Sequence, residues 1–146
     1  MRPDRIRKEK YDIGYVLKRV FPGNRLSGSR VKILFDGDLI NMGRSTFKVF
    51  KTMGVKCVSC GLEGKYFIKE KDPGDPFFTL NLYGINNKGE EIMMTKDHII
   101  PRAQGGSDDL ENFQVMCQRC NLSKGSGLSE EELEERKKIL AGGGDF

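Results

Sequence analysis

The sequence predicts an α+β fold in which short strands and short helices alternate along one domain of 146 residues. Two kinds of apolar pattern support this class, because some segments alternate with the period of a strand and others have helical spacing. The cysteines add a third observation, since all four fall into two Cys-x-x-Cys pairs, Cys57–Cys60 and Cys117–Cys120. We divide the chain into a basic α/β N-terminal extension (1–56), a cysteine-bearing core with inserted strands (57–128), and a C-terminal helix and tail (129–146).

The first 20 or so residues are predicted to form a charged lead followed by a short helix. The helix is indicated by apolar residues at helical spacing, namely Ile13, Val16, Leu17 and Val20. Pro22-Gly23 should end it, and residues 24–30 should form a polar loop.

A hairpin and a second helix should complete the extension. Residues 31–35 are expected to form a strand, Asp36-Gly37 a two-residue turn, and residues 38–40 the returning strand. Ser45 is expected to cap a helix that reaches Met53 and ends at Gly54. This helix should point Phe47, Phe50 and Met53 inward and Lys48 and Lys51 outward.

The core begins with three predicted strands at residues 65–70, 77–85 and 92–95. A Pro- and Gly-containing loop separates the first two, and Asn86–Gly89 forms a turn before the third. The aromatic residues of the second strand, Phe77, Phe78 and Tyr83, are interpreted as strand packing in preference to base stacking.

The C-terminal helix has a clear start signal. Ser129 and Glu132 form a capping box, and acidic residues fill the first turn. Arg136, Lys137 and Lys138 lie nearer the end, and Gly142–Gly144 should stop the helix.

Composition excludes some classes of protein and favours others. No apolar run approaches the ~18 residues of a membrane span, and the charged N-terminus has no apolar stretch behind it, so we expect a cytoplasmic protein without a signal peptide. Residues 1–56 carry 14 Lys and Arg against 5 Asp and Glu, whereas residues 57–146 carry 11 against 16. The basic part suggests a polyanionic partner, and a solvated charged surface is the alternative.

The paired cysteines predict a structural zinc site. Two Cys-x-x-Cys turns can place four thiolates around one cation, and a reducing cytosol disfavours disulfides. Two redox dithiols or four unrelated buried thiols are the alternatives. Four thiolates leave zinc no open position, so one zinc ion per chain should brace the fold and take no part in catalysis.

A second cluster of chemically active residues surrounds His98, the only histidine. It stands within the ordered elements Asp97-His98-Ile99-Ile100-Pro101, Gly105-Gly106, Asn112, Cys117-Gln118-Arg119-Cys120-Asn121 and Lys124-Gly125. Together these elements resemble the zinc-braced HNH (His-Me finger) endonuclease family. The resemblance spans about residues 57–125 and is strongest over 97–125.

The resemblance implies a ββα-metal core, in which a hairpin and a helix surround a divalent cation. Asp97 and Asn121 would be metal ligands, His98 the general base, and Asn112 the residue that holds the hairpin loop and orients His98. A further helix ligand found in some relatives would fall near Gly125, which has no side chain to supply it. Two oxygen ligands favour Mg²⁺ or Mn²⁺ over zinc at this second site.

The chemistry is consistent with phosphodiester hydrolysis, since an imidazole with an ordinary pKa near ~6.5 can accept a proton from water. We therefore expect a metal-dependent DNA endonuclease of phage, mobile-element or restriction type, with Arg102, Arg119 and Lys124 as candidate contacts to the DNA backbone. Solvated side chains are the alternative for these three. Asp108, Asp109 and Glu111 are interpreted as turn and surface residues. A non-catalytic, zinc-braced nucleic-acid-binding module is the alternative function, whereas catalysis by the cysteine-bound metal fails on ligand count.

Overall fold

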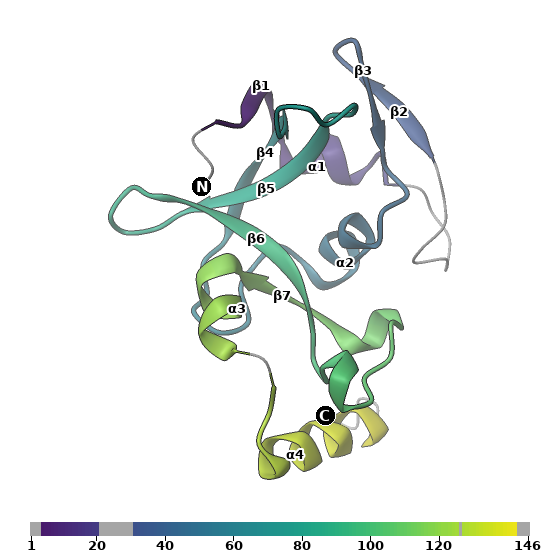
Figure 1. Cartoon of the computed structure of the whole chain (residues 1–146), viewed down its shortest axis with the longest axis vertical. Coiled ribbons are helices and arrows are strands. Elements are labelled where there is room, and N and C mark those ends of the chain that lie inside the picture. Colours follow the sequence, from purple (N-terminus) through teal and green to yellow (C-terminus); the bar gives the residue numbers. More distant parts are fainter. Residues whose placement is uncertain (1–3, 21–30, 126, 143–146) are drawn as a thin grey trace.

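A computed structural model describes residues 4–20, 31–125 and 127–142. It confirms the α+β class, with a five-stranded antiparallel sheet of order β1-β4-β5-β6-β7 and a separate β2–β3 hairpin (Figure 1). The strands are β1 (Ile6–Asp12), β2 (Lys32–Phe35), β3 (Asp38–Asn41), β4 (Gly64–Lys71), β5 (Thr79–Ile85), β6 (Glu91–His98) and β7 (Phe113–Cys117). The helices are α1 (Ile13–Leu17), α2 (Ser45–Met53), α3 (Gln118–Lys124) and α4 (Glu130–Gly142), with short 3₁₀ turns at Arg102–Gln104 and Leu110–Asn112.

The charged segment before α1 forms a strand, β1, which the sequence analysis did not predict. β1 pairs antiparallel with β4 at the edge of the sheet. Its residues are almost all exposed and charged, with Tyr11 the buried exception, so they lack the alternation that marks a strand. Tertiary ion pairs compensate, because Arg5 and Arg7 both bind the buried carboxylate of Glu70 on β4.

The predicted α1, the β2–β3 hairpin and α2 are all present. Asp36 and Gly37 both have positive φ, as a two-residue hairpin turn requires. The predicted end of α1 at Pro22-Gly23 and the loop at 24–30 lie outside the described residues. Arg44 is the residue before α2, and Ser45 opens the helix without capping it.

Two predicted orientations in α2 were wrong. Lys48 is only 5% exposed, whereas Met53 is 44% exposed. The helix contacts α1 as well as β6 and β7, so neighbours enclose the whole turn from Phe47 to Phe50 and the last turn extends beyond them.

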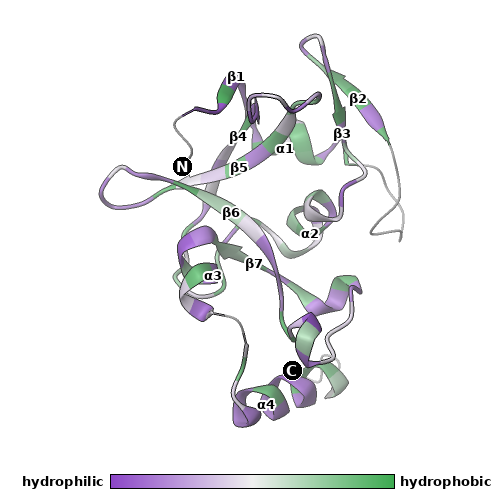
Figure 2. Ribbon diagram, in the orientation of Figure 1, coloured by the Kyte–Doolittle hydropathy of each residue, from purple (hydrophilic) through white to green (hydrophobic). Residues whose placement is uncertain are grey.

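The seven strands, α1 and α2 all contribute to one hydrophobic core. Its members include Val16, Phe35, Phe47, Phe67, Leu82 and Val115. Figure 2 shows apolar stretches in α1, α2 and β6, the elements around this core, and a mostly hydrophilic α4. The N-terminal part is therefore packed into the same core as the cysteine-bearing part, while the three-part division stays a prediction.

The strand interpretation of the aromatic residues holds for only part of the set. Tyr83 is buried in β5, and Phe78 is half-buried. Phe77 is 59% exposed, because β5 begins only at Thr79 and Phe77 belongs to the preceding loop. The packing interpretation of Phe77 was therefore wrong.

α4 begins with the predicted capping box. The Ser129 N–H donates to Glu132 Oε1 at 3.0 Å, and the Glu132 N–H donates to Ser129 Oγ at 3.2 Å. In front of the helix, Gln104 exchanges two hydrogen bonds with the backbone of Leu128. Every helix in the described part of the chain is too short or too polar to cross a membrane.

Candidate active site and metal centre

β6, β7 and α3 form a β–β–α unit that carries the predicted catalytic residues. Asp97 and His98 are the last two residues of β6, and they pair with Gln114 and Phe113 of β7. Because successive side chains of a strand point to opposite faces, Asp97 and His98 lie on different sides of the hairpin. Each side has its own set of neighbours.

Helix α3 packs on the Asp97 side. The Asn121 side-chain N–H donates to Thr95 Oγ1 at 3.0 Å, and Lys124 Nζ donates to Asp97 Oδ2 at 2.8 Å. Thr95 and Asp97 are two residues apart on β6, while Asn121 and Lys124 are one turn apart on α3. The helix therefore follows the end of the strand and places Asn121 and Lys124 along one face of it.

His98 lies on the other face, against Phe113 and Asp108. Its ring centroid is 4.7 Å from that of Phe113, and its Nε2 lies 2.8 Å from Asp108 Oδ1. Arg102 Nη2 donates to the other oxygen of Asp108 at 3.0 Å. The hydrogen bond with His98 lowers the pKa of Asp108, and the Arg102 guanidinium lowers it further. With its side chain 26% exposed, His98 is held in place yet open to solvent.

Asn112 is buried and closes the loop between β6 and β7. Its Oδ1 accepts from the Ile100 N–H at 3.0 Å, and its Nδ2 donates to the carbonyls of Ile100 and Ser107 at 3.1 and 2.7 Å. The backbone N–H of Ile99, next to His98, also donates to the Asn112 carbonyl. Asn112 thus fixes the backbone immediately after His98.

The glycine pair in this loop has a steric reason. Gly105 has a φ of +92°, and a Cβ on Gly106 would lie 1.7 Å from the Ile100 carbonyl oxygen. The loop can therefore close on itself only with glycine at these positions.

The three predicted DNA-backbone contacts all form ion pairs within the protein. Arg102 binds Asp108, Arg119 binds Glu90, and Lys124 binds Asp97. Arg102 and Arg119 are more than half exposed, whereas Lys124 is largely buried. A role of each in binding DNA stays a prediction.

The four cysteines converge from the turn before β4 and from the β7–α3 junction. Their Sγ atoms all lie within 4.8 Å of one another, and Cys60 Sγ is 3.8 Å from Cys117 Sγ. Zinc–sulfur bonds of about 2.3 Å in a tetrahedron place neighbouring sulfurs about 3.8 Å apart. The donor set and its spacing therefore suit a zinc ion.

The thiols also have the electrostatics of a cation site. Burial acts to raise the pKa of Cys57, but backbone hydrogen bonds from Cys60, Cys117 and Ser59 outweigh it and lower the pKa to about 6. Burial and the neighbouring thiols raise the pKa of Cys120 to about 12. Without a cation the cluster thus favours one thiolate and disfavours several, and a bound zinc ion would stabilise the thiolate form of all four.

A cavity of about 590 Å³ lies beside the cysteine cluster, and its lining includes Cys60, Leu62, Ile92 and Arg119. None of Asp97, His98, Asn112 and Asn121 lines it. This cavity therefore does not contain the predicted catalytic residues.

Sequence reasoning missed the partners that surround His98 and Asp97. Lys96 and Phe113 contact each other on the His98 face, and Gln114 Nε2 donates to Asp97 Oδ2 at 2.9 Å. Lys96 could have been predicted, because residues two apart on a strand share a face and Lys96 is two residues before His98. The β7 residues carried no comparable signal, because their positions depend on the hairpin register.

Comparison with known families identifies this segment. Residues 86–127 match the HNH endonuclease family, and the match spans β6, the loop held by Asn112, β7 and α3. The resemblance to the HNH endonuclease family that the sequence motifs predicted is therefore confirmed for this segment. Searches of curated proteins and of solved structures gave no significant match.

Proposed function

We propose that this protein is an HNH endonuclease that hydrolyses phosphodiester bonds in DNA. The observation that supports this most strongly is the end of β6, where Asp97 binds Lys124 of the packed helix α3, Asn121 lies on the same face of that helix, and His98 directly follows Asp97. All four residues fall within the segment that matches the family.

His98 is the proposed general base. When its Nε2–H donates to Asp108, the lone pair of Nδ1 is left to accept a proton from water. Phe113 and Asp108 restrict the ring, and Asn112 fixes the backbone that follows it. Asp108 is therefore proposed as a positioning residue for His98, in addition to its predicted place in a turn.

Asp97 and Asn121 are the proposed ligands of a divalent cation. Among the described residues, Oδ1 of Asp97 and Oδ1 of Asn121 have no hydrogen-bond partner, so both oxygens are available as hard ligands. Oxygen ligands of this kind suit Mg²⁺ or Mn²⁺. When bound, such a cation neutralises charge on the scissile phosphate and assists the leaving 3′ oxygen. Gly125 supplies no further side chain.

The cysteine cluster has a separate role in the proposal. Cys57, Cys60, Cys117 and Cys120 would hold one structural zinc, which ties the turn before β4 to the start of α3. Because α3 carries Asn121 and Lys124, this brace sets the position of the helix beside Asp97. The protein would act in the cytoplasm, where thiols stay reduced.

Incubation of supercoiled plasmid with the protein tests this function. Nicked or linear DNA should form with Mg²⁺ or Mn²⁺ and should be absent with EDTA. Binding of the plasmid without cleavage under every metal condition would favour the non-catalytic binding module instead.

A further inference from the structure

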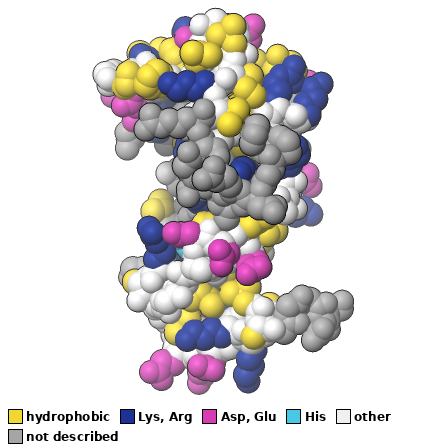
Figure 3. Space-filling model, turned by 90° about the vertical axis from the view of Figure 1, so that its right-hand side faces the viewer, with side chains coloured by type: hydrophobic (Ala, Val, Ile, Leu, Met, Phe, Trp, Pro, Cys, Tyr) yellow, Lys and Arg dark blue, Asp and Glu magenta, His cyan; other side chains and the backbone are white. Residues whose placement is uncertain are grey.

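A second cavity, of about 370 Å³, lies between the β2–β3 hairpin and the loop that leads into β5. Its lining includes Lys32, Leu39, Asn41, Arg44, Phe77 and Phe78. None of the residues assigned above to catalysis or metal binding belongs to it. Figure 3 shows hydrophobic side chains flanked by Lys and Arg in the upper part of this side of the molecule.

The aromatic residues of this cavity are surrounded by cations. Lys32 Nζ lies 4.2 Å from the ring centroid of the exposed Phe77. Lys8 and Lys71 lie 4.4 and 5.1 Å from the ring of Phe78. An accessible aromatic ring among cations combines the two features that bind single-stranded nucleic acid, a surface for base stacking and charges for the phosphates.

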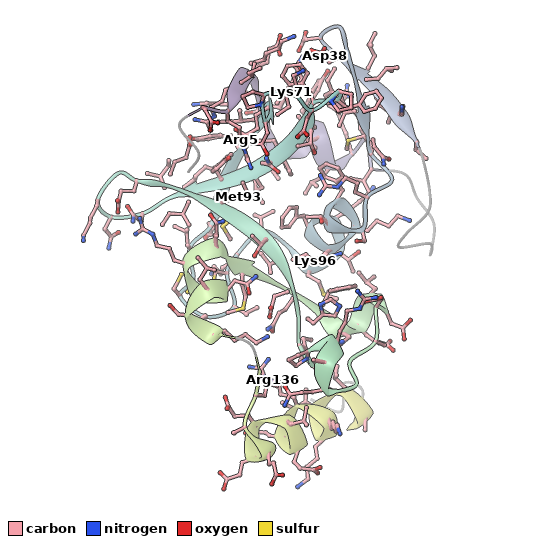
Figure 4. All side chains as sticks on the ribbon, in the orientation of Figure 1. Arg5, Asp38, Lys71, Met93, Lys96 and Arg136 are labelled. Atoms are coloured by element: carbon pink, nitrogen blue, oxygen red, sulfur yellow. The ribbon has the colours of Figure 1, made fainter. Side chains whose placement is uncertain are left out.

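A basic connection leads from this cavity to His98. Arg44 lines the cavity, and the next residue, Ser45, accepts a hydrogen bond from Lys96 Nζ at 2.6 Å. Lys96 lies beside α2 in Figure 4, and its Nζ is 4.6 Å from the ring centroid of Phe113, the residue that packs against His98.

The positive charges of Arg44 and Lys96 are not paired with carboxylates of the described part of the protein. Neither Arg44 nor Lys96 forms a salt bridge within the described ranges. Lys96 is partly buried and Arg44 is exposed, so an anion such as a phosphate could reach and neutralise both charges.

The size of the cavity restricts what it can hold. About 370 Å³ is near the lower limit of small-molecule sites, which span ~300–1,000 Å³. A duplex, whose major groove alone is ~12 Å wide, cannot enter it. We propose that this cavity binds one unpaired nucleotide of the DNA strand, with its base against Phe77 and its phosphates along Lys32, Arg44 and Lys96 toward His98. This inference rests on the proposed function, and it specifies a substrate with a single-stranded segment.

The test compares a fluorescent single-stranded oligonucleotide with a blunt duplex of the same length, in buffer without added divalent metal so that no cleavage occurs. Phe77→Leu keeps an apolar side chain but removes the aromatic face. It should weaken single-strand binding by roughly 5-fold or more and leave duplex binding within 2-fold of the original protein. Tyr15→Leu removes an exposed aromatic ring outside the cavity and should change neither affinity.

Charge substitutions supply an independent measurement. For the single strand, the logarithm of the binding constant falls as the logarithm of the salt concentration rises. Lys32→Gln and Arg44→Gln should each make this negative slope shallower by about 0.7. Lys88→Gln, in the β5–β6 turn on the opposite side of the molecule (Figure 1), should leave that slope unchanged. Unchanged single-strand binding in Phe77→Leu, or an equal loss for duplex and single strand, overturns the proposed nucleotide site.

Failure of this inference is distinguishable from failure of the proposed function. If the original protein cleaves plasmid and Phe77→Leu binds single strands normally, the nucleotide site is wrong and the nuclease stands. If the original protein cleaves no DNA while Phe77→Leu loses single-strand affinity selectively, the site stands and the nuclease activity is wrong.

Discussion

Asp97, a proposed metal ligand, forms an ion pair with Lys124. Its carboxylate and the ammonium of Lys124 are both about nine-tenths buried and lie 2.8 Å apart. The ammonium also donates to the His98 carbonyl at 2.8 Å. Lys124 therefore balances the charge of Asp97 and connects α3 to the end of β6.

Replacing this lysine should make the fold depend on divalent metal. Lys124→Met leaves the Asp97 carboxylate without its cation, which should lower the free energy of unfolding by roughly 2–4 kcal/mol. Added Mg²⁺ should restore part of that loss by taking over the charge balance. Thermal melts with and without Mg²⁺ measure this, and the Mg²⁺-induced rise in Tm should be larger in the variant than in the original protein.

Lys137→Met on the exposed face of α4 is the matched control for this experiment. Its melting temperature should respond to Mg²⁺ as that of the original protein does. An equal response of Lys124→Met and Lys137→Met would show that no cation binds beside Asp97.

At the scale of elements, β1 is held to the sheet by a buried carboxylate. Glu70 accepts hydrogen bonds from Arg5 at 2.7 Å, Arg7 at 3.0 Å, Asn81 at 2.6 Å and the Tyr83 hydroxyl. Burial acts to raise the pKa of Glu70, but the hydrogen bonds from Tyr83, Asn81 and Arg5 outweigh it, and the pKa lies below its ordinary value. The stabilisation by these hydrogen bonds is present in full above the pKa that the Glu70 carboxyl has in the unfolded chain.

This carboxylate should make stability depend on acid. Since its pKa is lower in the folded state, its contribution to the free energy of unfolding should decline as the pH falls below about 4.5 and through the folded pKa. Glu70→Gln should cost roughly 2 kcal/mol at pH 7 and weaken the pH dependence below about 4.5. Urea unfolding at several pH values measures both effects. Glu135→Gln, on the exposed surface of α4, is the control, and an identical acid profile for both variants would contradict this role of Glu70.

The β7–α3 junction should depend on zinc. Metal analysis should find about one zinc per chain, and Cys117→Ser or a strong chelator should remove it and lower the Tm steeply, because the site ties two distant segments. Val58→Ala changes an exposed residue between two ligands and should keep the zinc. A stably folded protein without metal would contradict the structural role.

For the whole molecule, the basic extension is inseparable from the core. Val16, Phe35 and Phe47 lie in the same hydrophobic cluster as Phe67 and Val115. Deleting residues 1–56 would therefore unfold the protein, so a role of this region in DNA binding must be tested by single substitutions such as Arg44→Gln.

The sequence predicted features that depend on residues close together in the chain, such as motifs, turns and helix caps. The HNH segment could be recognised because the order and spacing of Asp97, His98, Asn112 and Asn121 resemble a family motif, and the capping box at Ser129 is a local signal. β1 was missed because pairing with β4 and ion pairs to Glu70 stabilise it, and neither appears in its own residues. The burial of Lys48 likewise depends on which elements surround α2.

Cleavage by His98→Ala tests the central claim most directly. Removing a general base typically costs ~10²–10⁴-fold in rate, and the side chain is partly exposed, so the variant should fold and bind DNA normally. The measurement is the single-turnover rate of plasmid nicking with Mg²⁺, together with the Kd for the same DNA. The proposed mechanism predicts at least a ~100-fold loss of rate at an unchanged Kd. A variant that cleaves at the rate of the original protein would contradict it.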